Sequence, residues 1–324
     1  MLMTARILAR RGIPGAPRAM VPNVREVRRR ELEEFLRLAL ANAGDIEDRL
    51  GLRARSERQL GSLNRPGIWI LLRLLRALGR SPVRLLVADE QGTPVGTTVA
   101  LLLGPWAYVA AVGVREDHRN QGIAQALVRR AEEIGRRARK TWLVLQVDSE
   151  NEPARRLYAK LGWSAGPTVR WWELPSTPPE ARELPVRAVD RKERERAHAA
   201  AARRLGVEFP RGFVHPCELI CRGSGGPHGT MATGPAGVPS LVLGYWAGHE
   251  GESGFLLPVS TAEPSDGEAG ALLEAGRGLL LRSGSHGIFV PVVGDDPRLE
   301  TVLRAMGGTP RASSEFRWKP TAPA

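Results

Sequence analysis

The sequence is short of cysteine and of long apolar runs, and each shortage excludes a class of protein. Two cysteines in 324 residues, Cys217 and Cys221, cannot build the framework of a disulfide-rich secreted domain, so a reducing, cytoplasmic compartment is expected. No apolar run reaches the roughly 20 residues that a membrane-spanning helix needs. The first acidic residue is Glu26, and the Arg-rich start lacks the apolar core of a secretory leader. A transit peptide is the minor alternative.

Lysine is scarce as well, and the excess of positive charge is confined to the first half of the chain. Only 4 of the 47 basic residues are lysines, and the net charge is +12. Residues 1–174 carry 30 basic and 18 acidic residues, whereas residues 175–324 carry 17 of each. Such a field attracts polyanions in general, so a phosphorylated cofactor, a nucleic acid and an anionic membrane all qualify. The basic stretches lack interleaved aromatic residues, which argues against a nucleic-acid partner.

The middle of the chain alternates between apolar strands and amphipathic helices. Residues 107–114 and 141–148 have the composition of buried strands, and residues 121–139 place apolar side chains at a helical period. Residues 151–162 predict a second, shorter helix that ends at a glycine. Nearer the start, residues 24–42 are rich in Arg, Glu and Leu and predict a surface helix.

The chain also repeats itself at an offset of 145 residues. The residues that match at this offset are Val114 with Val259, Gly122 with Gly267, Ala124 with Ala269, Leu127 with Leu272, and Val147 with Val292. Self-similarity at one offset indicates two copies of one structural unit. The Pro-rich stretch 175–185 is typical of a linker. We therefore expect two domains, residues 1–174 and residues 186–324; one continuous domain is the alternative.

The stretch HRNQGIA, residues 118–124, joins the predicted strand 107–114 to the helix that follows it. The first amides of a helix have no internal partner and carry partial positive charge. Gly122 lets a ligand approach the backbone, and Arg119 adds a fork for phosphate oxygens. Together these features predict a pocket for a pyrophosphate, although the stretch is neither a P-loop nor a three-glycine dinucleotide site. A tight turn without a ligand is the alternative.

Two motifs around this stretch carry a resemblance to a known family. The first is Val-x-x-x-x-Arg-x-x-Gly-x-Ala, formed by Val114, Arg119, Gly122 and Ala124. The second is Asn-x-x-Ala-x-x-x-Tyr-x-x-x-Gly-Trp, formed by Asn151, Ala154, Tyr158, Gly162 and Trp163. In this order the motifs resemble the GNAT superfamily of acyl-CoA-dependent N-acetyltransferases. The resemblance is specific over residues 83–174 and extends to residues 185–324 mainly through the repeat.

The resemblance implies an α+β fold of two GNAT-like domains, each a mixed, mostly antiparallel sheet flanked by helices. It also implies acetyl-CoA as co-substrate, no metal, and transfer of the acetyl group to a primary amine by direct attack. The family binds the CoA pyrophosphate on the backbone at the start of this helix, which here means Arg119, Asn120, Gln121, Gly122, Ile123 and Ala124. The strand at Val112 and Val114 would splay from residues 141–148 and pair with the pantetheine amides.

The resemblance further assigns roles to two residues of the second motif. Asn151 would hold the cofactor arm, and Tyr158 would protonate the leaving CoA thiolate. The chemistry of the side chain agrees, because a phenol can donate a hydrogen bond to a thiolate as it forms. An aromatic packed in the core is the alternative reading of Tyr158, one of only three tyrosines.

One position departs from the family's pattern. Relatives that acetylate protein N-termini carry a Glu general base in the sequence LEV on the second strand, whereas this chain has LQV with Gln146. Because an amide cannot accept a proton, either Asp148, Glu150 or a water chain deprotonates the amine, or the amine arrives neutral. A ribosomal-protein type of substrate is correspondingly less expected.

The second copy departs further. At the 145-residue offset, Pro264 replaces the arginine of the first motif, Asp266 and Glu268 replace Gln121 and Ile123, and Leu303 replaces the tyrosine. Acidic groups repel a pyrophosphate. We expect this copy to be degenerate and not to bind CoA productively.

The remaining features concern the acceptor and other ligands. The amphipathic stretch 66–80 is expected to flank an acceptor groove, with a membrane-surface helix as the alternative. Asp45, Glu47 and Asp48 could steer a cationic amine or form a solvated face. Four further residues have the side chains of a zinc site but irregular spacing, so no metal is predicted: His215, Cys217, Cys221 and His228.

The acceptor is expected to be an amine-bearing small molecule, peptide or protein, and no nucleic acid or membrane is predicted as a partner. A homodimer is left open. Two other classes of function remain as alternatives. One is a non-catalytic acyl-CoA-binding or regulatory protein. The other is a basic nucleic-acid or membrane-surface binder, which would show a steep salt dependence.

Overall fold

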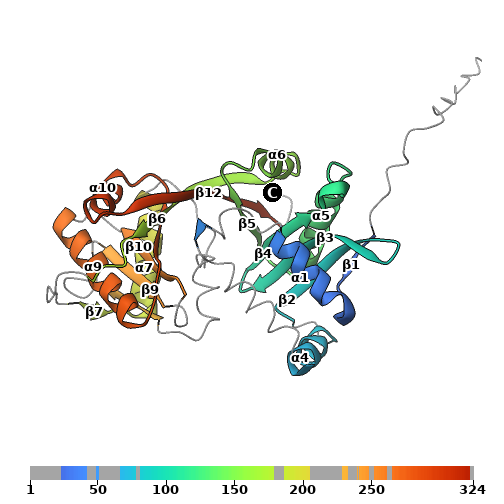
Figure 1. The fold of residues 1–324 in the computed structure, drawn as a ribbon, viewed down its shortest axis with the longest axis horizontal. Helices are drawn as coiled ribbons and strands as arrows, with labels where there is room; N and C mark the ends of the chain where they lie inside the picture. Colours follow the sequence, from blue (N-terminus) through green and yellow to red (C-terminus); the bar gives the residue numbers. More distant parts are fainter. Residues whose placement is uncertain are drawn as a thin grey trace, which may run out of the picture.

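The computed structural model describes residues 23–41, 49–50, 66–77, 81–178, 186–204, 228–232, 239, 241–247, 252–260 and 265–321. Its strands are β1 (Asn23–Glu26), β2 (Val83–Glu90), β3 (Thr93–Leu103), β4 (Trp106–Val114), β5 (Trp142–Asp148), β6 (Ser164–Leu174), β7 (Arg187–Ala188), β8 (His228–Ala232), β9 (Leu241–Trp246), β10 (Gly254–Ser260), β11 (Ile288–Val293) and β12 (Thr309–Pro320). They form one 12-stranded sheet in the order β1-β2-β3-β4-β5-β12-β6-β11-β10-β9-β8-β7 (Figure 1).

Two pairs of neighbouring strands are parallel, β4 with β5 and β10 with β11, and the other pairs are antiparallel. The helices are α1 (Leu32–Ala41), α4 (Pro66–Ala77), α5 (Ile123–Arg137), α6 (Glu152–Lys160), α7 (Arg191–Arg204), α9 (Asp266–Arg282) and α10 (Pro297–Ala305), with short 3-10 turns η1 (Arg29–Glu31) and η2 (Glu116–His118). These mixed, mostly antiparallel strands with flanking helices confirm the predicted α+β class.

The apolar residues that recur at a helical period in the sequence form the buried face of α5. Ile123, Leu127 and Ala131 are buried against β3 and β4, as predicted. The prediction of one surface helix over residues 24–42 is wrong at its start. Residues 23–26 instead add an edge strand to β2, and α1 begins only at Leu32. This helix is not purely a surface element, because Phe35 is fully buried beneath it.

The 145-residue repeat holds for whole elements. At this offset α6 maps onto α10 with identical bounds, and the starts of β6 and β12 coincide. The turn that follows each short helix is also the same, because Gly162 and Gly307 both have left-handed backbones, with φ of 79° and 76°. Such a φ favours glycine over any residue with a Cβ. The two copies therefore share this turn as well as their order of strands and helices.

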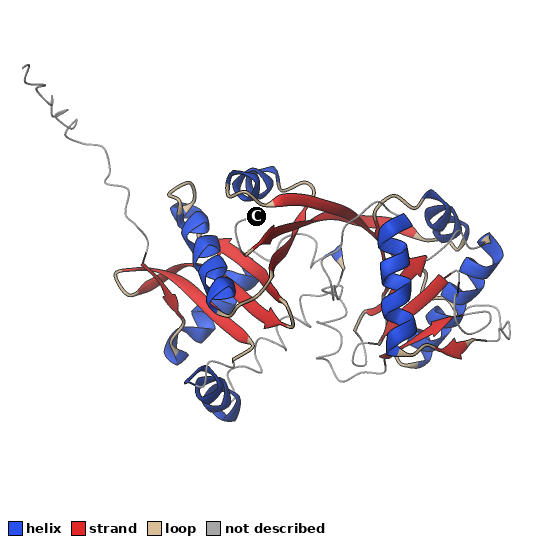
Figure 2. Ribbon diagram, turned by 180° about the vertical axis from the view of Figure 1, so that it is seen from behind, coloured by secondary structure: helices blue, strands red, loops and turns tan. Residues whose placement is uncertain are grey.

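The final strands of the two copies are exchanged. β12, from the end of the second copy, pairs with β5 of the first, and β6, from the end of the first copy, pairs with β11 of the second. β6 and β12 also pair with each other along most of their length. Figures 1 and 2 show these two long strands connecting one group of helices and strands to the other. The predicted limits at residues 174 and 186 stay predictions, and the strand exchange means that each copy is completed by the other.

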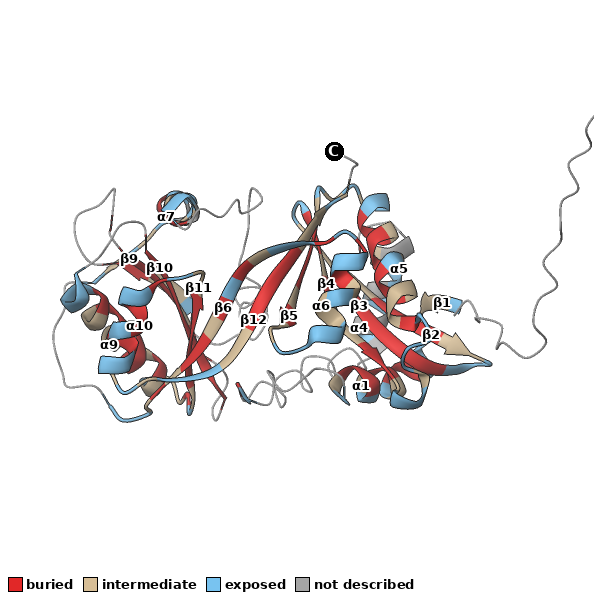
Figure 3. Cartoon of the chain, turned by 90° about the horizontal axis from the view of Figure 1, so that it is seen from above, coloured by how far each residue is buried: buried red, intermediate tan, exposed pale blue. Residues whose placement is uncertain are grey.

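The buried side chains form separate clusters on the two faces of the sheet. α5 covers one face of the first copy and α1 the other (Figure 3). α9 and α10 cover the corresponding face of the second copy. A shared cluster spans both copies on the remaining face and contains large aromatic side chains: Trp106, Trp171, Trp246, Phe255, Phe289 and Phe316. Burying one side chain of this kind stabilises a fold by roughly 1.5–3 kcal/mol, so the cluster helps to hold the two copies together.

Candidate functional site

The loop before α5 has the open backbone that an anion site needs. Gly122 is the N-cap residue of α5 and has a left-handed φ of 80°, and no side chain caps the first turn. The helix-start amides therefore lack a capping side chain. A Cβ placed on Gly122 would find no atom within 4 Å, so the space in front of the loop is free of the described protein atoms. Asn120 also has a positive φ, 62°, which turns the chain back toward the helix.

The predicted side chains of this loop differ in what they can contribute. Arg119, Asn120, Gln121 and Gly122 are exposed, and the Arg119 Nε lies 3.4 Å from the Val114 carbonyl oxygen. Two further residues belong to the helix: Ile123, which is buried, and Ala124, which is half-buried. The Ile123 side chain is part of the hydrophobic core, so only its backbone is available for a ligand.

His118 holds the base of this loop. Its Nδ1 lies 2.6 Å from Asp117 Oδ1, and its Nε2 lies 2.6 Å from Glu90 Oε2. The hydrogen bond to Asp117 is the main reason why the pKa of His118 is raised, and the bond to Glu90 adds to it. Arg115 stands beside both groups and binds Asp117 through Nε and Nη2 at 2.7 and 3.1 Å. The imidazole thus ties the loop to the end of β2.

The two parallel strands of the first copy separate beside this loop. β4 and β5 pair only from Trp106 with Trp142 to Tyr108 with Val144, although both strands continue beyond that point. A bulge in β4 falls within the unpaired part, where Ala111 has a φ of 50° and the register with β3 shifts. The backbone groups of β4 beyond Tyr108 are consequently not paired to β5, as a strand that pairs with an extended ligand requires.

The bulge also decides which side chains face α5. Ala107 and Val109 belong to the core beneath α5, and after the bulge Val112 and Val114 do so. Thr97 and Thr98 of β3 fix the bulge by donating their hydroxyl protons to the carbonyl oxygens of Ala111 and Ala110, at 3.3 and 3.1 Å. Val112 and Val114 therefore lie on the separated part of β4.

Tyr158 and Asn151 lie on α6, on the α5 side of the sheet. Tyr158 is 6% exposed, its ring centroid lies 6.1 Å from that of Trp163, and burial raises its pKa to about 12. Its hydroxyl has no hydrogen-bond partner among the described residues. Asn151 is the N-cap of α6, and its Oδ1 accepts a bond from the Ala154 amide at 3.1 Å. The side-chain nitrogen of Asn151 makes no hydrogen bond to the described residues and can hold a ligand.

The candidates for the general base lie along β5 and just after it. Gln146 and Asp148 lie on the same face of β5 as Val144, opposite α5. Gln146 Nε2 donates to Ser314 Oγ of β12 at 2.6 Å, and Asp148 Oδ1 accepts the Glu150 amide at 2.8 Å. The Glu150 carboxylate is exposed and lies 3.3 Å from Arg49 Nη2. The choice among these groups, a water chain and a neutral amine stays open.

The second copy starts its helix differently: Gly267, the counterpart of Gly122, lies within α9 and has no left-handed φ. Ser265 caps α9 by accepting a bond from the Glu268 amide, and the Glu268 carboxylate accepts one from the Ser265 amide. Glu268 is therefore part of a capping box, and the protein's own groups satisfy amides that the first copy leaves uncapped. β10 pairs with β9 without a bulge and contains Pro258, which has no amide proton to offer a ligand.

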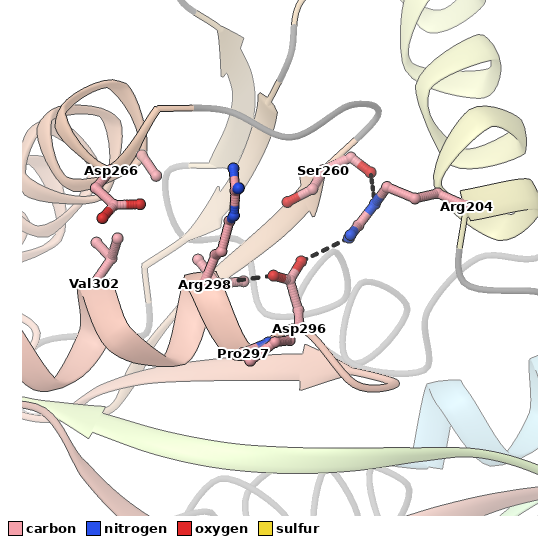
Figure 4. Close-up of a pocket in the computed structure, with 9 residues that line it drawn as sticks. Arg204, Ser260, Asp266, Asp296, Pro297, Arg298 and Val302 are labelled. Carbon is pink, nitrogen blue, oxygen red and sulfur yellow. Dashed lines mark hydrogen bonds and ion pairs between the residues drawn. The ribbon is translucent and has the colours of Figure 1, made fainter.

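An arginine lies beside the starts of α9 and α10 in the second copy. Arg204 of α7 donates to Asp296 Oδ2 at 2.6 Å and to the Ser260 carbonyl at 3.3 Å (Figure 4). Asp296 is the counterpart of Asn151 at the 145-residue offset. The cavity that these residues line, with Asp266 at its edge, has a volume of about 100 Å³. Ligand sites for molecules of drug size are roughly 300–1,000 Å³, so this one is small.

Sequence reasoning missed Ser314, Trp171 and Arg204. Each reaches its position from an element whose neighbour is set by the strand exchange or by the packing of α7, and no local motif marks it. The resemblance of β12 to β6 identifies the two as counterparts and does not reveal which strand lies beside β5.

Several predicted features fall outside the described residues. These are the acidic residues Asp45, Glu47 and Asp48, residues 179–185 of the predicted linker 175–185, and His215, Cys217 and Cys221. In the part of the chain that is described, no His, Cys, Asp and Glu side chains are grouped as a metal site would require. Within the same ranges, no helix is long and apolar enough to cross a membrane.

Comparisons with known proteins agree with this geometry. Residues 54–163 match the model of the acetyltransferase (GNAT) family. No curated protein matches the sequence. A GCN5-related N-acetyltransferase from Sphaerobacter thermophilus is 17% identical, with a TM-score of 0.54 and coverage of 93% of this chain and 96% of that one. A tandem GNAT protein from the clavulanic acid biosynthesis pathway is 16% identical, with a TM-score of 0.52 and coverage of 93% and 99%.

A third similar structure is the glucosamine N-acetyltransferase region of a fungal multi-domain β-N-acetylglucosaminidase. It is 16% identical with a TM-score of 0.57, and the match covers 95% of this chain and 40% of that one. At these identities the likeness concerns the fold alone. The fold of two GNAT-like units in one chain, predicted from the repeat, is thereby confirmed.

Proposed function

The chain carries a domain of the acetyltransferase (GNAT) family, and from this premise we propose that it is an acetyl-CoA-dependent N-acetyltransferase that works through its first copy. One observation carries the proposal. The unpaired stretch of β4, with its bulge at Ala111, lies beside a helix start that no side chain caps. That combination offers amides both to an extended chain and to a diphosphate.

In this proposal the first copy binds the co-substrate along a single path. The amides of residues 119–124 hold the pyrophosphate, and Arg119 supplies a further cation. The separated backbone at Val112 and Val114 pairs with the pantetheine amides. Asn151 contributes its side-chain nitrogen to the same arm. The positive charge of residues 1–174 favours the approach of such a polyanion.

Acetyl transfer then takes place where β4 and β5 separate. The lone pair of the acceptor amine attacks the thioester carbonyl carbon, a C–N bond forms, and the C–S bond breaks. Tyr158, whose pKa of about 12 keeps it protonated, donates to the sulfur as negative charge develops there. The proton that the nitrogen loses restores the phenol through solvent. Direct transfer needs no covalent acyl-enzyme.

The second copy is proposed to serve as scaffold. Its helix start is capped by Ser265 and Glu268, and Arg204 occupies the position next to Asp296. Both observations support the expectation that it does not bind CoA productively.

A thiol-release assay tests the proposal. The chain is mixed with acetyl-CoA and a panel of primary amines, and free CoA is measured with a thiol reagent. Amine-dependent release is expected, and each turnover should give one acetylated amine by mass spectrometry. Binding of acetyl-CoA without amine-dependent release would instead favour a non-catalytic acyl-CoA-binding protein.

A further inference from the structure

One buried hydroxyl from the second copy controls a side chain at the first copy's candidate site. Ser314 of β12 is fully buried, and its Oγ accepts a hydrogen bond from Gln146 Nε2 at 2.6 Å. The same oxygen accepts a second bond from Trp171 Nε1 of β6 at 3.2 Å. An indole nitrogen only donates, and a hydroxyl oxygen has two acceptor positions. Both positions are therefore used.

In this arrangement the amide nitrogen of Gln146 faces Ser314. With Nε2 bound to Ser314, the carboxamide oxygen Oε1 lies on the other side of the planar group. Oε1 is an acceptor with two lone pairs and no charge. Gln146 is half-buried, so its side chain has some access to solvent.

Gln146 also lies where the two strands separate. Val144 is the last β5 residue paired with β4, and Gln146 follows it on the same face. Tyr158 packs with Leu143 and Leu145 on the opposite face. A group between the separated strands thus has the phenol on one side and the carboxamide on the other.

We propose that Gln146 Oε1 accepts a hydrogen bond from the acceptor amine, and that Ser314 and Trp171 are positioning residues that hold it there. This inference rests on the proposed function. The amine donates one N–H to Oε1, which leaves its lone pair directed at the thioester carbon. Two of the three residues come from the exchanged strands β6 and β12, so the strand exchange completes the acceptor side of the site.

The neutrality of the carboxamide defines the class of acceptor. A carboxylate at this position would attract an ammonium and take its proton, and a carboxamide does neither. The site should therefore favour amines that have a substantial neutral fraction near pH 7.5. An α-amino group, with a pKa of roughly 7.7–8.0, meets this condition better than an alkylamine like the lysine side chain, with a pKa of about 10.4.

The test compares leucinamide with 3-methylbutylamine, which have similar apolar side chains and differ in amine basicity. At pH 7.5 and saturating acetyl-CoA, kcat/KM for leucinamide should exceed that for 3-methylbutylamine by at least about tenfold, within the roughly 200-fold difference between their neutral fractions. Gln146→Glu should reduce this preference and add an acidic limb to the pH profile of kcat/KM. An unchanged preference in that variant would overturn the role of Gln146.

Two further variants test the positioning residues. Ser314→Ala and Trp171→Phe should each raise KM for leucinamide by roughly three- to tenfold, the effect of one neutral hydrogen bond, and leave the acetyl-CoA affinity unchanged. Ser313→Ala is the matched control, because this neighbouring hydroxyl bonds instead to Ser149 Oγ at 3.0 Å. Equal effects of Ser313→Ala and Ser314→Ala on KM would contradict a positioning role.

A titration of the wild-type chain with acetyl-CoA distinguishes a failure of the proposed function from a failure of the acceptor assignment. No binding would overturn the proposed function itself. Binding without turnover of either amine would overturn the assignment of the acceptor class, and binding with a preference for 3-methylbutylamine would do the same.

Discussion

Val169 and Ser314 lie directly opposite each other on the antiparallel strands β6 and β12, although they occupy equivalent positions in the two copies. Their neighbours are equivalent as well. Ser314 pairs with Asp148 of β5, and Val169 pairs with Val293 of β11, which is Asp148 shifted by 145 residues. The two copies are thus related by an approximate twofold axis that passes between Val169 and Ser314.

This symmetry predicts how the first copy behaves alone. A fragment of residues 1–174 lacks β12 and leaves β5 with an unpaired edge, which is a template for pairing with another chain. Because β6 is the counterpart of β12, two fragments can exchange β6 strands. The fragment should be a dimer by light scattering after size-exclusion chromatography. A folded monomer would contradict the account of the strand exchange.

A second prediction concerns the attachment of β12 to the first copy. Glu132 is 4% exposed and accepts bonds from Trp163 Nε1 at 2.8 Å and Lys319 Nζ at 3.2 Å. Lys319→Met removes the nearer of the two cations of this buried carboxylate and leaves only Arg136, whose Nη1 lies 3.6 Å from Glu132 Oε2. The free energy of unfolding should fall by about 2 kcal/mol, less than for a fully buried pair because Lys319 is partly exposed. Urea unfolding measures the change, with the exposed Lys160→Met as control; equal midpoints for both variants would refute it.

The sequence was sufficient for part of this structure, and the reasons differ between elements. The period of Ile123, Leu127 and Ala131 predicted α5 because a helix buries one face, and the 145-residue offset predicted the second copy. The strand exchange could not be predicted. β6 and β12 have similar patterns, and either order buries the same side chains, so local alternation carries no information about which strand lies beside β5.

The candidate site divides in the same way. The glycine of the loop and the tyrosine of α6 are marked by motifs, because their backbone angle and chemistry require those residue types. Ser314 is a small hydroxyl in a strand and Arg204 one of many arginines, so neither differs from its surroundings in sequence. Their roles arise from partners 168 and 92 residues away.

The loop before α5 should respond to pH through His118. Its pKa is raised in the folded chain, first by the hydrogen bond to Asp117 and then by that to Glu90, whereas the nearby Arg115 lowers it. A raised pKa stabilises the folded state fully below the unfolded value of about 6.5, and this contribution is lost as the pH rises through the folded pKa. As the pH is raised above 6.5, the Tm of His118→Gln should therefore fall less than the Tm of the wild type. Parallel curves of Tm against pH would contradict this role.

Tyr158 should matter for the chemical step and little for binding. Tyr158→Phe removes a hydroxyl that has no partner among the described residues and keeps the ring packed against Trp163. We expect kcat to fall by about 100-fold, with the affinity for acetyl-CoA and the unfolding free energy nearly unchanged. Because its pKa is about 12, the wild type should show no loss of kcat from this group below about pH 10. A variant with wild-type kcat would assign Tyr158 to the core alone.

The central claim is that one loop, in the first copy only, holds the diphosphate of acetyl-CoA. Calorimetric titration with acetyl-CoA tests it in the wild type, in Gly122→Glu, and in Gly267→Glu, the same change at the equivalent glycine of the second copy. Gly122→Ala is a further control, because it adds the strain of a left-handed Cβ without a charge, about 1 kcal/mol. We predict one site per chain, lost in Gly122→Glu, weakened in Gly122→Ala and intact in Gly267→Glu. Two sites, no site, or a loss caused by Gly267→Glu would contradict the claim.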